Sequence, residues 1–290
     1  MPFMTHNSSN QFPPILSGKH YAEPSVFTAE NMLREARRQK KLVEQPIPRV
    51  CILDPDGDIV RNLVAKGLAI QSTSWACYHS HLHEFEHAGI QFGIVGCAVG
   101  ASYAVLIAEE MFACGCELLI SVTSSGQILP MGPTPYFVLI EKALRDEGTS
   151  YHYLPPSEYS FLKDSLRDLS VEALAETPYR VHQGATWTTD APFRETAFAI
   201  EHRRQQGILA VEMEAAALYA FAAARKKSVI CFAHVTNQMA SIDGDFEKGE
   251  EDGSKDALNL ISRVAKLWLE TMASAVVYPL AVQPVEIPIA

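Results

Sequence analysis

The 290-residue sequence predicts an α/β domain in which a mostly parallel sheet is covered by helices. The main observation is that apolar runs of strand length alternate with helix-length segments along most of the chain. A second observation is the hydrophobic content of 48%, which provides a sizeable core. The length suits one large domain or two smaller ones, and no internal repeat is apparent.

The elements follow from this pattern in chain order. Thr28 is a candidate N-cap for a helix over residues 29–41, and Pro46 and Pro48 break the chain after it. Strands are predicted over residues 50–53, 67–73, 91–95, 118–122, 182–188, 208–211 and 229–235. Helices are predicted over residues 59–65, 103–113, 136–146, 157–165, 197–205, 215–224 and 256–269. Residues 1–25 are expected to form an extended arm, residues 26–270 the domain, and residues 271–290 a tail on the surface or against a partner subunit.

Composition excludes several classes of protein. A net charge of −10 argues against a nucleic-acid partner, which would normally be met by a basic patch. The six cysteines lie mostly in apolar runs, which favours free thiols and a cytoplasmic location. The N-terminus shows no apolar signal segment, and prolines interrupt the apolar C-terminus, so no membrane partner is expected.

The most informative motif is the stretch from Val211 to Ala220, which places Glu212, Met213 and Glu214 where a strand passes into an alanine-rich helix. Open α/β folds place ligand sites at such junctions. A carboxylate there can accept two hydrogen bonds from a sugar diol, and the methionine offers an apolar surface. The alternative is an ordinary acidic pair in the first turn of a helix.

Two further segments can hold an anion. Gly93, Gly96 and Gly100 lie between a strand and a helix, but their spacing matches neither a dinucleotide fingerprint nor a P-loop. They favour a tight turn, whose amides at the helix start can bind an anion or a hydroxyl. Ser124 and Ser125 end the next strand before a glycine, and such a loop can wrap a phosphate.

The stretch Val-Glu-Met-Glu-Ala-Ala-Ala resembles the ribose-binding signature of the nucleoside phosphorylase family, which includes uridine phosphorylases, hexameric-type purine nucleoside phosphorylases and methylthioadenosine nucleosidases. Residues 51–58, 94–101, 118–126 and 187–194 resemble, in the family's order, its first strand and loop, glycine-rich turn, phosphate loop and base-pocket segment. The resemblance implies a single domain with a mixed, partly closed sheet surrounded by helices. It also implies a homo-oligomer, a dimer or trimer of dimers, with sites at the dimer interface.

The family's ribose contacts carry over to four residues. Glu214 would hold the ribose hydroxyls, Met213 would lie under the sugar, and Glu212 would support them. His20, in the N-terminal arm, matches a histidine that reaches across the subunit interface to the ribose 5′-hydroxyl in uridine phosphorylases.

The family's phosphate contacts carry over only in part. Ser124, Ser125 and the turn at Gly100 would border the phosphate. Phosphorylases usually carry arginines at the positions that align with Ile59 and Ser121, and arginine suits phosphate because its fork gives charged, bidentate contacts.

The base contacts concern Phe193, Arg194 and Asn237. Phe193 can stack on a nucleobase and Arg194 can donate to a base carbonyl, although Arg194 could instead pair with Glu195 on the surface. Asn237 aligns with an aspartate that protonates the leaving purine in purine-cleaving relatives. Because an amide cannot supply that proton, the pattern favours a uridine-like base that leaves with hydrogen-bond support.

The sequence therefore predicts phosphorolysis of a nucleoside N-glycosidic bond, which gives a free base and ribose 1-phosphate. Phosphate would be the co-substrate, and no metal or organic cofactor is expected. The absent arginines keep two alternatives open, a hydrolase that uses water and a non-catalytic nucleoside-binding protein. His79, His81 and His83 alternate as if on one face of a strand, but their spacing favours an exposed hairpin over a zinc site.

Overall fold

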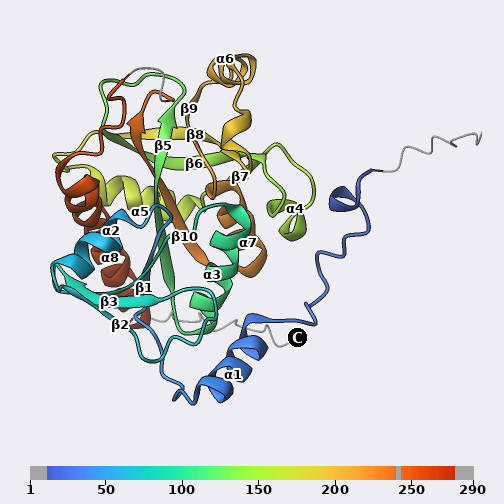
Figure 1. Cartoon of the computed structure of the whole chain (residues 1–290), viewed down its shortest axis with the longest axis vertical. Helices are drawn as coiled ribbons and strands as arrows, with labels where there is room; N and C mark the ends of the chain where they lie inside the picture. The colour runs from blue at the N-terminus through green and yellow to red at the C-terminus, as the bar shows by residue number, and fades with distance from the viewer. Residues whose placement is uncertain (1–11, 240–242, 278–290) are drawn as a thin grey trace, which may run out of the picture.

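The computed structural model describes residues 12–239 and 243–277, and within them ten strands form one sheet (Figure 1). The strands are β1 (Val50–Asp54), β2 (Ala69–Gln71), β3 (Leu82–His87), β4 (Ile90–Gly96), β5 (Leu118–Gln127), β6 (Tyr136–Asp146), β7 (Tyr159–Phe161), β8 (Val181–Thr189), β9 (Ile208–Glu212) and β10 (Ser228–Asn237). Buried apolar side chains from nearly all of them make up the core.

The sheet is mixed and closes on itself through part of its width. Strands β10, β6, β8, β9 and β5 follow one another, and β10 also pairs with β5, which completes a ring. Strands β1, β4, β3 and β2 extend outward from β5. Parallel pairing joins β5 to β1 and β10, whereas β5 meets β9 antiparallel. The predicted mixed, partly closed sheet of a single α/β domain is therefore confirmed.

Helices cover the sheet on both sides. They are α1 (Ala29–Lys40), α2 (Asp58–Ala65), α3 (Ala101–Ala113), α4 (Ser150–Tyr153), α5 (Asp164–Leu174), α6 (Ala197–Gln205), α7 (Ala215–Arg225) and α8 (Ser254–Val277). Figure 1 shows α2, α5 and α8 to one side and α3, α4 and α7 to the other. The Thr28 side chain caps α1 by accepting a hydrogen bond from the Asn31 amide, as predicted. Helix α7 is buried along its first seven residues, which fits its lack of a polar face.

Two helix predictions are wrong. Residues 136–146 form β6, which pairs with β10 and β8 at its two edges and is buried along most of its length. Such a strand has a continuous apolar run that periodicity alone cannot distinguish from a buried helix. Residues 157–165 were also predicted as a helix, but they contain the short strand β7, and α5 begins at Asp164.

The histidine-rich segment forms a hairpin, although not with the expected alternation. Of His79, His81 and His83, only His83 lies in β3, which pairs antiparallel with β4 through a turn at Ala88 and Gly89. Both turn residues have positive φ, 51° and 76°, which matches the right-handed twist of a two-residue hairpin. The ring of His81 is bonded to Gln71, 3.0 Å away, so the side chains do not share one strand face.

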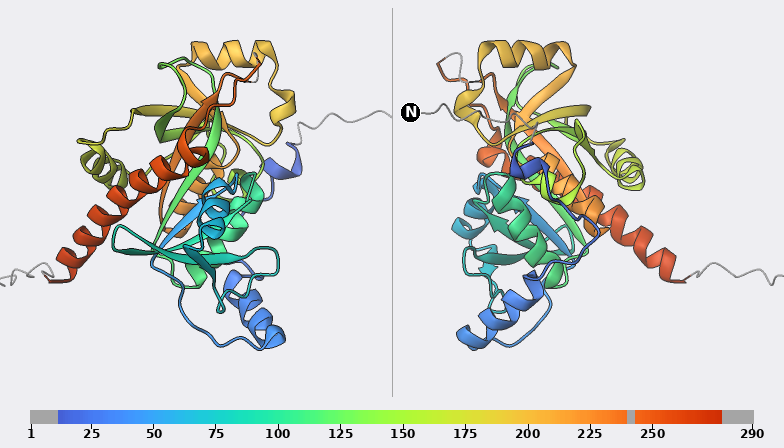
Figure 2. Two further views of the ribbon diagram at one scale, coloured as in Figure 1. Left: turned by 60° about the vertical axis from the view of Figure 1, so that its left-hand side comes forward. Right: turned by 90° about the vertical axis from the view of Figure 1, so that its right-hand side faces the viewer.

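The two ends of the described chain lie along the outside of the domain. The arm contains a short 3-10 turn, η1 (Pro14–Leu16), and the Tyr21 hydroxyl donates to the Tyr151 carbonyl of α4 at 3.2 Å. Helix α8, the long helix in Figure 2, continues to Val277, so the predicted tail starts inside it and its residues 278–290 lie outside the described part. Among the described residues, no helix has the length and apolar character needed to cross a bilayer.

Candidate active site

The ribose motif and the glycine turn, which lie far apart in sequence, meet at one end of the sheet. Glu214 follows β9 and is the N-cap residue of α7, and Gly100 is the N-cap residue of α3. The Gly100 amide donates to the Glu214 carboxylate at 2.7 Å. Glu214 is 1% exposed, while Met213 beside it is half-buried. The structure thus joins two of the predicted site segments through a direct hydrogen bond.

Glu212 positions this arrangement. Its carboxylate accepts hydrogen bonds from the hydroxyls of Thr186 and Thr188 at 3.1 and 2.5 Å. It also accepts from the backbone amides of Glu214 and Ala215, both at 2.7 Å. Because four donors fill its two oxygens, Glu212 has no acceptor left for a direct contact with substrate, and a supporting role remains. Glu212 instead caps the first turn of α7 and holds Glu214 in place.

Burial changes the ionisation of both glutamates. Loss of water raises the pKa of Glu214 to about 8, and the nearby charge of Glu212 adds to the rise, while the Gly100 amide opposes it. Burial likewise raises the pKa of Glu212, against the pull of its hydrogen bonds. Glu214 is therefore largely protonated at neutral pH until a ligand stabilises its charge. A sugar that develops positive charge would do so.

The two serines of the predicted phosphate loop make different contacts. The Ser124 amide donates to the Asp56 carboxylate at 2.6 Å, and the Ser124 hydroxyl lies 2.7 Å from that of Thr236 on β10. The Ser125 hydroxyl donates to the Thr123 carbonyl at 3.1 Å, so it faces its own strand rather than the site. Of the two serines, Ser124 is the one that lies with the other site residues.

Three aspartates lie where β1 passes into α2: Asp54 ends the strand, Asp56 lies in the loop and Asp58 begins the helix. Asp54 is 2% exposed and accepts hydrogen bonds from the Gly57 and Val60 amides at 3.1 and 2.9 Å. Burial raises the pKa of Asp54 to about 7 and also raises the pKa of Asp56, whose carboxylate the Ser124 amide partly stabilises. Together with Glu214, this end of the sheet is rich in carboxyl groups.

The cations near these carboxyl groups are already engaged. Arg61 and Lys248 both form ion pairs with Asp58. Arg49 forms a bidentate pair with Glu117 at 2.8 Å and precedes β1, at the opposite end of that strand from the site. The aligned positions of the family's arginines, Ile59 and Ser121, are both buried. Arg49 and Arg61, the arginines nearest in sequence to the first loop, are therefore both held by acidic side chains.

A small cavity of about 20 Å³ lies among these groups. Its volume is enough for a single water molecule and too small for a phosphate ion. Its lining consists of carboxylates, a serine, a histidine and small or apolar side chains, namely Asp54, Asp56, Asp58, Ile59, Val122, Ser124, His234, Asp252, Gly253 and Ala257. Burial, aided by the charge of Lys248, lowers the pKa of His234 to about 4, so its ring is neutral.

Asn237 holds the loop after β10 rather than an open position in the site. Its amide nitrogen donates to the Ser125 carbonyl at 3.4 Å and to the Thr236 hydroxyl at 3.2 Å. Its oxygen accepts from the Met239 amide at 3.0 Å. The same segment is tied down by the Glu247 amide, which donates to the Thr236 carbonyl at 2.8 Å.

The predicted base contacts lie on the surface of the single chain. Phe193 is 100% exposed, on the 3-10 turn η2 (Pro192–Arg194) that follows β8. Arg194 is exposed as well, and no ion pair joins it to Glu195 within the described ranges. His20 is exposed in the arm, where its ring lies 3.6 Å from the Glu23 carboxylate. These three residues do not contact the buried group around Glu214.

Three residues of this region were missed by sequence reasoning. Asp56, Thr236 and Lys248 all lie within the network around Ser124 and Asp58. The alternation of Asp54, Asp56 and Asp58 directly after a strand was the available signal, because strand ends gather polar ligand groups.

The sheet is mixed and closed into a ring, and at its edge the buried Glu214 carboxylate accepts a hydrogen bond from Gly100. This fold and this site agree with the family that the sequence comparison identifies. The sequence matches the family described as the phosphorylase superfamily over residues 49–267, and the chain belongs to that family. It is 27% identical over 202 residues to a uridine phosphorylase from Thermococcus kodakarensis, which covers 65% of this chain and 71% of the relative. It is 27% identical over 168 residues to a guanosine phosphorylase from Halorubrum lacusprofundi, which covers 57% of this chain and 66%, less than two thirds, of the relative.

Solved structures agree on the fold. The uridine phosphorylase of Vibrio fischeri ES114, crystallised with 6-hydroxy-1-naphthoic acid, superimposes with a TM-score of 0.63 at 18% identity. The match covers 82% of this chain and 99% of the other.

Proposed function

We propose that the protein cleaves the N-glycosidic bond of a uridine-like nucleoside and transfers the ribosyl group to phosphate. The contact between Glu214 and the Gly100 turn carries this proposal, because it places the ribose signature beside the amides of a helix start. The ionised Glu214 would accept hydrogen bonds from ribose hydroxyls and stabilise the cationic sugar of the transition state. Met213 would support the sugar's apolar face.

The uridine preference is supported by Asn237, which stands where purine-cleaving relatives carry an aspartate. The Asn237 amide cannot protonate a leaving base, and its three hydrogen bonds fix it in the loop. A base that leaves as a stabilised anion needs no such proton, and Arg194 on η2 could support its carbonyl. Family membership alone does not decide the base, since the relatives include both a uridine and a guanosine phosphorylase.

A neighbouring subunit would complete the base side in this proposal. Phe193 is 100% exposed and Phe198 on α6 is 84% exposed, and large exposed aromatic side chains of this kind are typical of interfaces. We expect a homo-oligomer, which light scattering on the purified protein can measure. A strictly monomeric protein that still cleaves nucleosides would remove this part of the proposal.

Water is a second candidate for the nucleophile, and one observation favours it. The Asp56 carboxylate accepts the hydrogen bond of the Ser124 amide at 2.6 Å, and it borders a cavity large enough for one water molecule. A phosphate ion would have to displace this carboxylate, whereas a water molecule beside Asp56 could be deprotonated by it as it attacks the sugar. The engaged cations at Asp58 also weaken the case for phosphate.

A panel of nucleosides, assayed with and without phosphate by chromatography of the released base, tests the proposal. Release of uracil that requires phosphate supports the phosphorylase. Release at equal rates without phosphate supports the hydrolase, and Asp56→Asn should then reduce that rate strongly. Binding of nucleosides without release of any base would leave a non-catalytic binding protein.

A further inference from the structure

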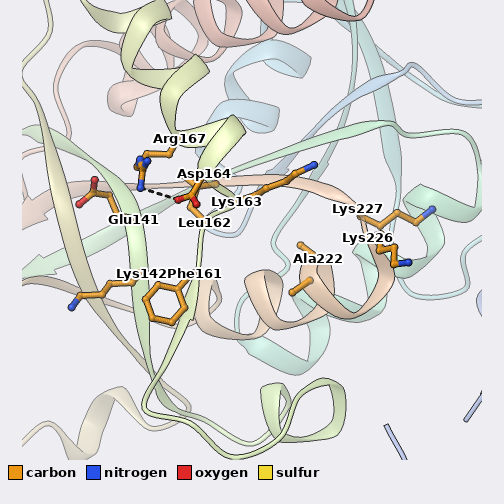
Figure 3. Close-up of a pocket in the computed structure, with 11 residues that line it drawn as sticks. Glu141, Lys142, Phe161, Leu162, Lys163, Asp164, Arg167, Ala222, Lys226 and Lys227 are labelled. Carbon is orange, nitrogen blue, oxygen red and sulfur yellow. Dashed lines mark hydrogen bonds and ion pairs between the residues drawn. The ribbon is translucent and has the colours of Figure 1, made fainter. Parts of the chain in front are cut away.

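A second concave surface lies among β6, β7, the start of α5 and the end of α7 (Figure 3). None of its lining residues belongs to the carboxylate site, the group formed by Asp54, Asp56, Asp58 and Glu214. The volume of the second surface is about 780 Å³, within the range of small-molecule sites. Its lining includes the apolar side chains of Leu162, Ala222 and Ala223 and the exposed aromatic ring of Phe161. We call this surface the lysine groove.

The lysine groove is strongly basic in an acidic protein. Five cationic side chains line it, against two acidic ones, Glu141 and Asp164, although the whole chain carries a net charge of −10. The cations are Lys142, Lys163, Arg167, Lys226 and Lys227. The excess of three positive charges therefore gathers at one place.

Four of these cations have no carboxylate partner. Arg167 is paired with Asp164 and Asp168, both at 2.9 Å. Within the described residues, no carboxylate lies within 4.0 Å of the four lysines. Two of the four lie over aromatic rings instead, Lys142 at 4.4 Å from the Tyr159 ring centre and Lys227 at 5.3 Å from that of Phe112.

Attraction to the C-terminal end of a helix dipole explains only two of these four lysines. Lys226 and Lys227 follow α7, whose C-terminal carbonyls attract cations. Lys142 lies on β6, and Lys163 is the N-cap residue of α5, where a cation is unfavourable for the helix. The unfavourable position of Lys163 is compensated if an anion binds beside it and beside the first amides of α5.

The groove also carries an exposed phenylalanine, Phe161, whose ring can stack on the aromatic ring of a ligand. Lys142 and Phe161 are directly opposite each other in the antiparallel pair β6–β7, so their side chains lie on one face of the sheet. Phe161 is 62% exposed, and Figure 3 shows it beside Lys142 at the left, with Lys226 and Lys227 at the right and Lys163 between them. An aromatic ring on one side and several cations on the other match a ligand with a flat base and a phosphate.

We propose that the lysine groove is a second ligand site, which binds a nucleotide by its phosphate at Lys163, Lys226 and Lys227 and by its base at Phe161. It is separate from the carboxylate site, which would hold the ribose of an uncharged nucleoside. This proposal does not depend on the proposed catalytic function.

Calorimetric titration of the full chain with uridine and adenosine monophosphates, and with inorganic phosphate, tests it. We expect saturable nucleotide binding that Lys163→Glu and Lys226→Glu each weaken about tenfold or more, because each replaces an attractive charge by a repulsive one. Phe161→Ala should weaken nucleotides but not inorganic phosphate. Glu214→Gln should leave nucleotide binding unchanged.

Lys41→Glu is the matched control, because Lys41 is also an exposed lysine at the left-handed C-cap of a helix, with φ 56° against 55° for Lys226. It should have no effect on nucleotide binding. The proposal fails if no saturable binding occurs, if Lys41→Glu weakens binding as much as Lys226→Glu, or if Glu214→Gln abolishes it. Equal binding of inorganic phosphate and nucleotides, insensitive to Phe161→Ala, would overturn the nucleotide assignment.

Discussion

Glu214→Gln is the substitution that examines the ribose site most closely. The amide keeps the size of the side chain and an oxygen that can accept from Gly100 at 2.7 Å, but it removes the ionised form. A hydrogen bond to a charged group contributes about 1.5–3 kcal/mol and a neutral one about 0.5–1.5 kcal/mol. Two ribose hydroxyls therefore lose about 2–3 kcal/mol in the transition state, which corresponds to roughly a 10²-fold fall in kcat/KM.

The pKa of Glu214 adds a second signature. Because burial raises that pKa to about 8, the wild-type kcat/KM should increase from neutral pH to about pH 8 as the carboxylate ionises. The variant has no such group, so its profile should be flat over this range. Initial rates of base release, measured for both proteins across this pH range, give the loss in kcat/KM and the two pH profiles.

Glu110→Gln provides the matched control. Glu110 is a carboxyl group on α3 that is 1% exposed, has a pKa raised by burial, and lies outside the site. It should leave kcat/KM within a few fold of the wild type. Equal kinetics for Glu214→Gln and wild type, or an equal loss in Glu110→Gln, would refute the assignment of Glu214 to ribose.

Two further predictions concern the base side and stability. Arg194→Ala should reduce kcat/KM for nucleosides with a carbonyl acceptor on the base far more than for others, and an equal effect on all nucleosides would instead favour a surface role. Asp54 has a pKa raised to about 7, so the folded state binds its proton more tightly than the unfolded state does. Its contribution to stability, on the order of 4 kcal/mol, is present below pH 4 and is lost as pH rises to about 7. Asp54→Asn should therefore flatten the decline of Tm over this pH window, and an unchanged decline would contradict the burial argument.

Sequence reasoning succeeded where chemistry and local pattern coincide. The position of Glu214 at a strand-to-helix junction followed from the local pattern, whereas its hydrogen bond to the Gly100 amide is known only from the structure. The ring closure of the sheet came from the family resemblance, since the pairing of β10 with β5 joins segments that no local pattern connects.

Prediction from the sequence failed where contacts between distant segments decide the local structure. The local pattern of the β6 segment does not distinguish a buried helix from a buried strand, and hydrogen bonding to strands on both sides makes it a strand. The role of Asp56 depends on its contact with the Ser124 amide, 68 residues away, which spacing does not show. Phe193 and Arg194, assigned to the base by resemblance, both lie on the surface of the single chain, so their contact with a base stays a prediction.

The fate of the ribosyl group tests the central claim most directly. Uridine and phosphate should be incubated with the enzyme, and the sugar product followed by ³¹P nuclear magnetic resonance together with uracil release. We predict that ribose 1-phosphate accumulates in step with uracil and that omission of phosphate stops both. Uracil release with free ribose as the sugar product would show that water is the nucleophile and contradict phosphorolysis.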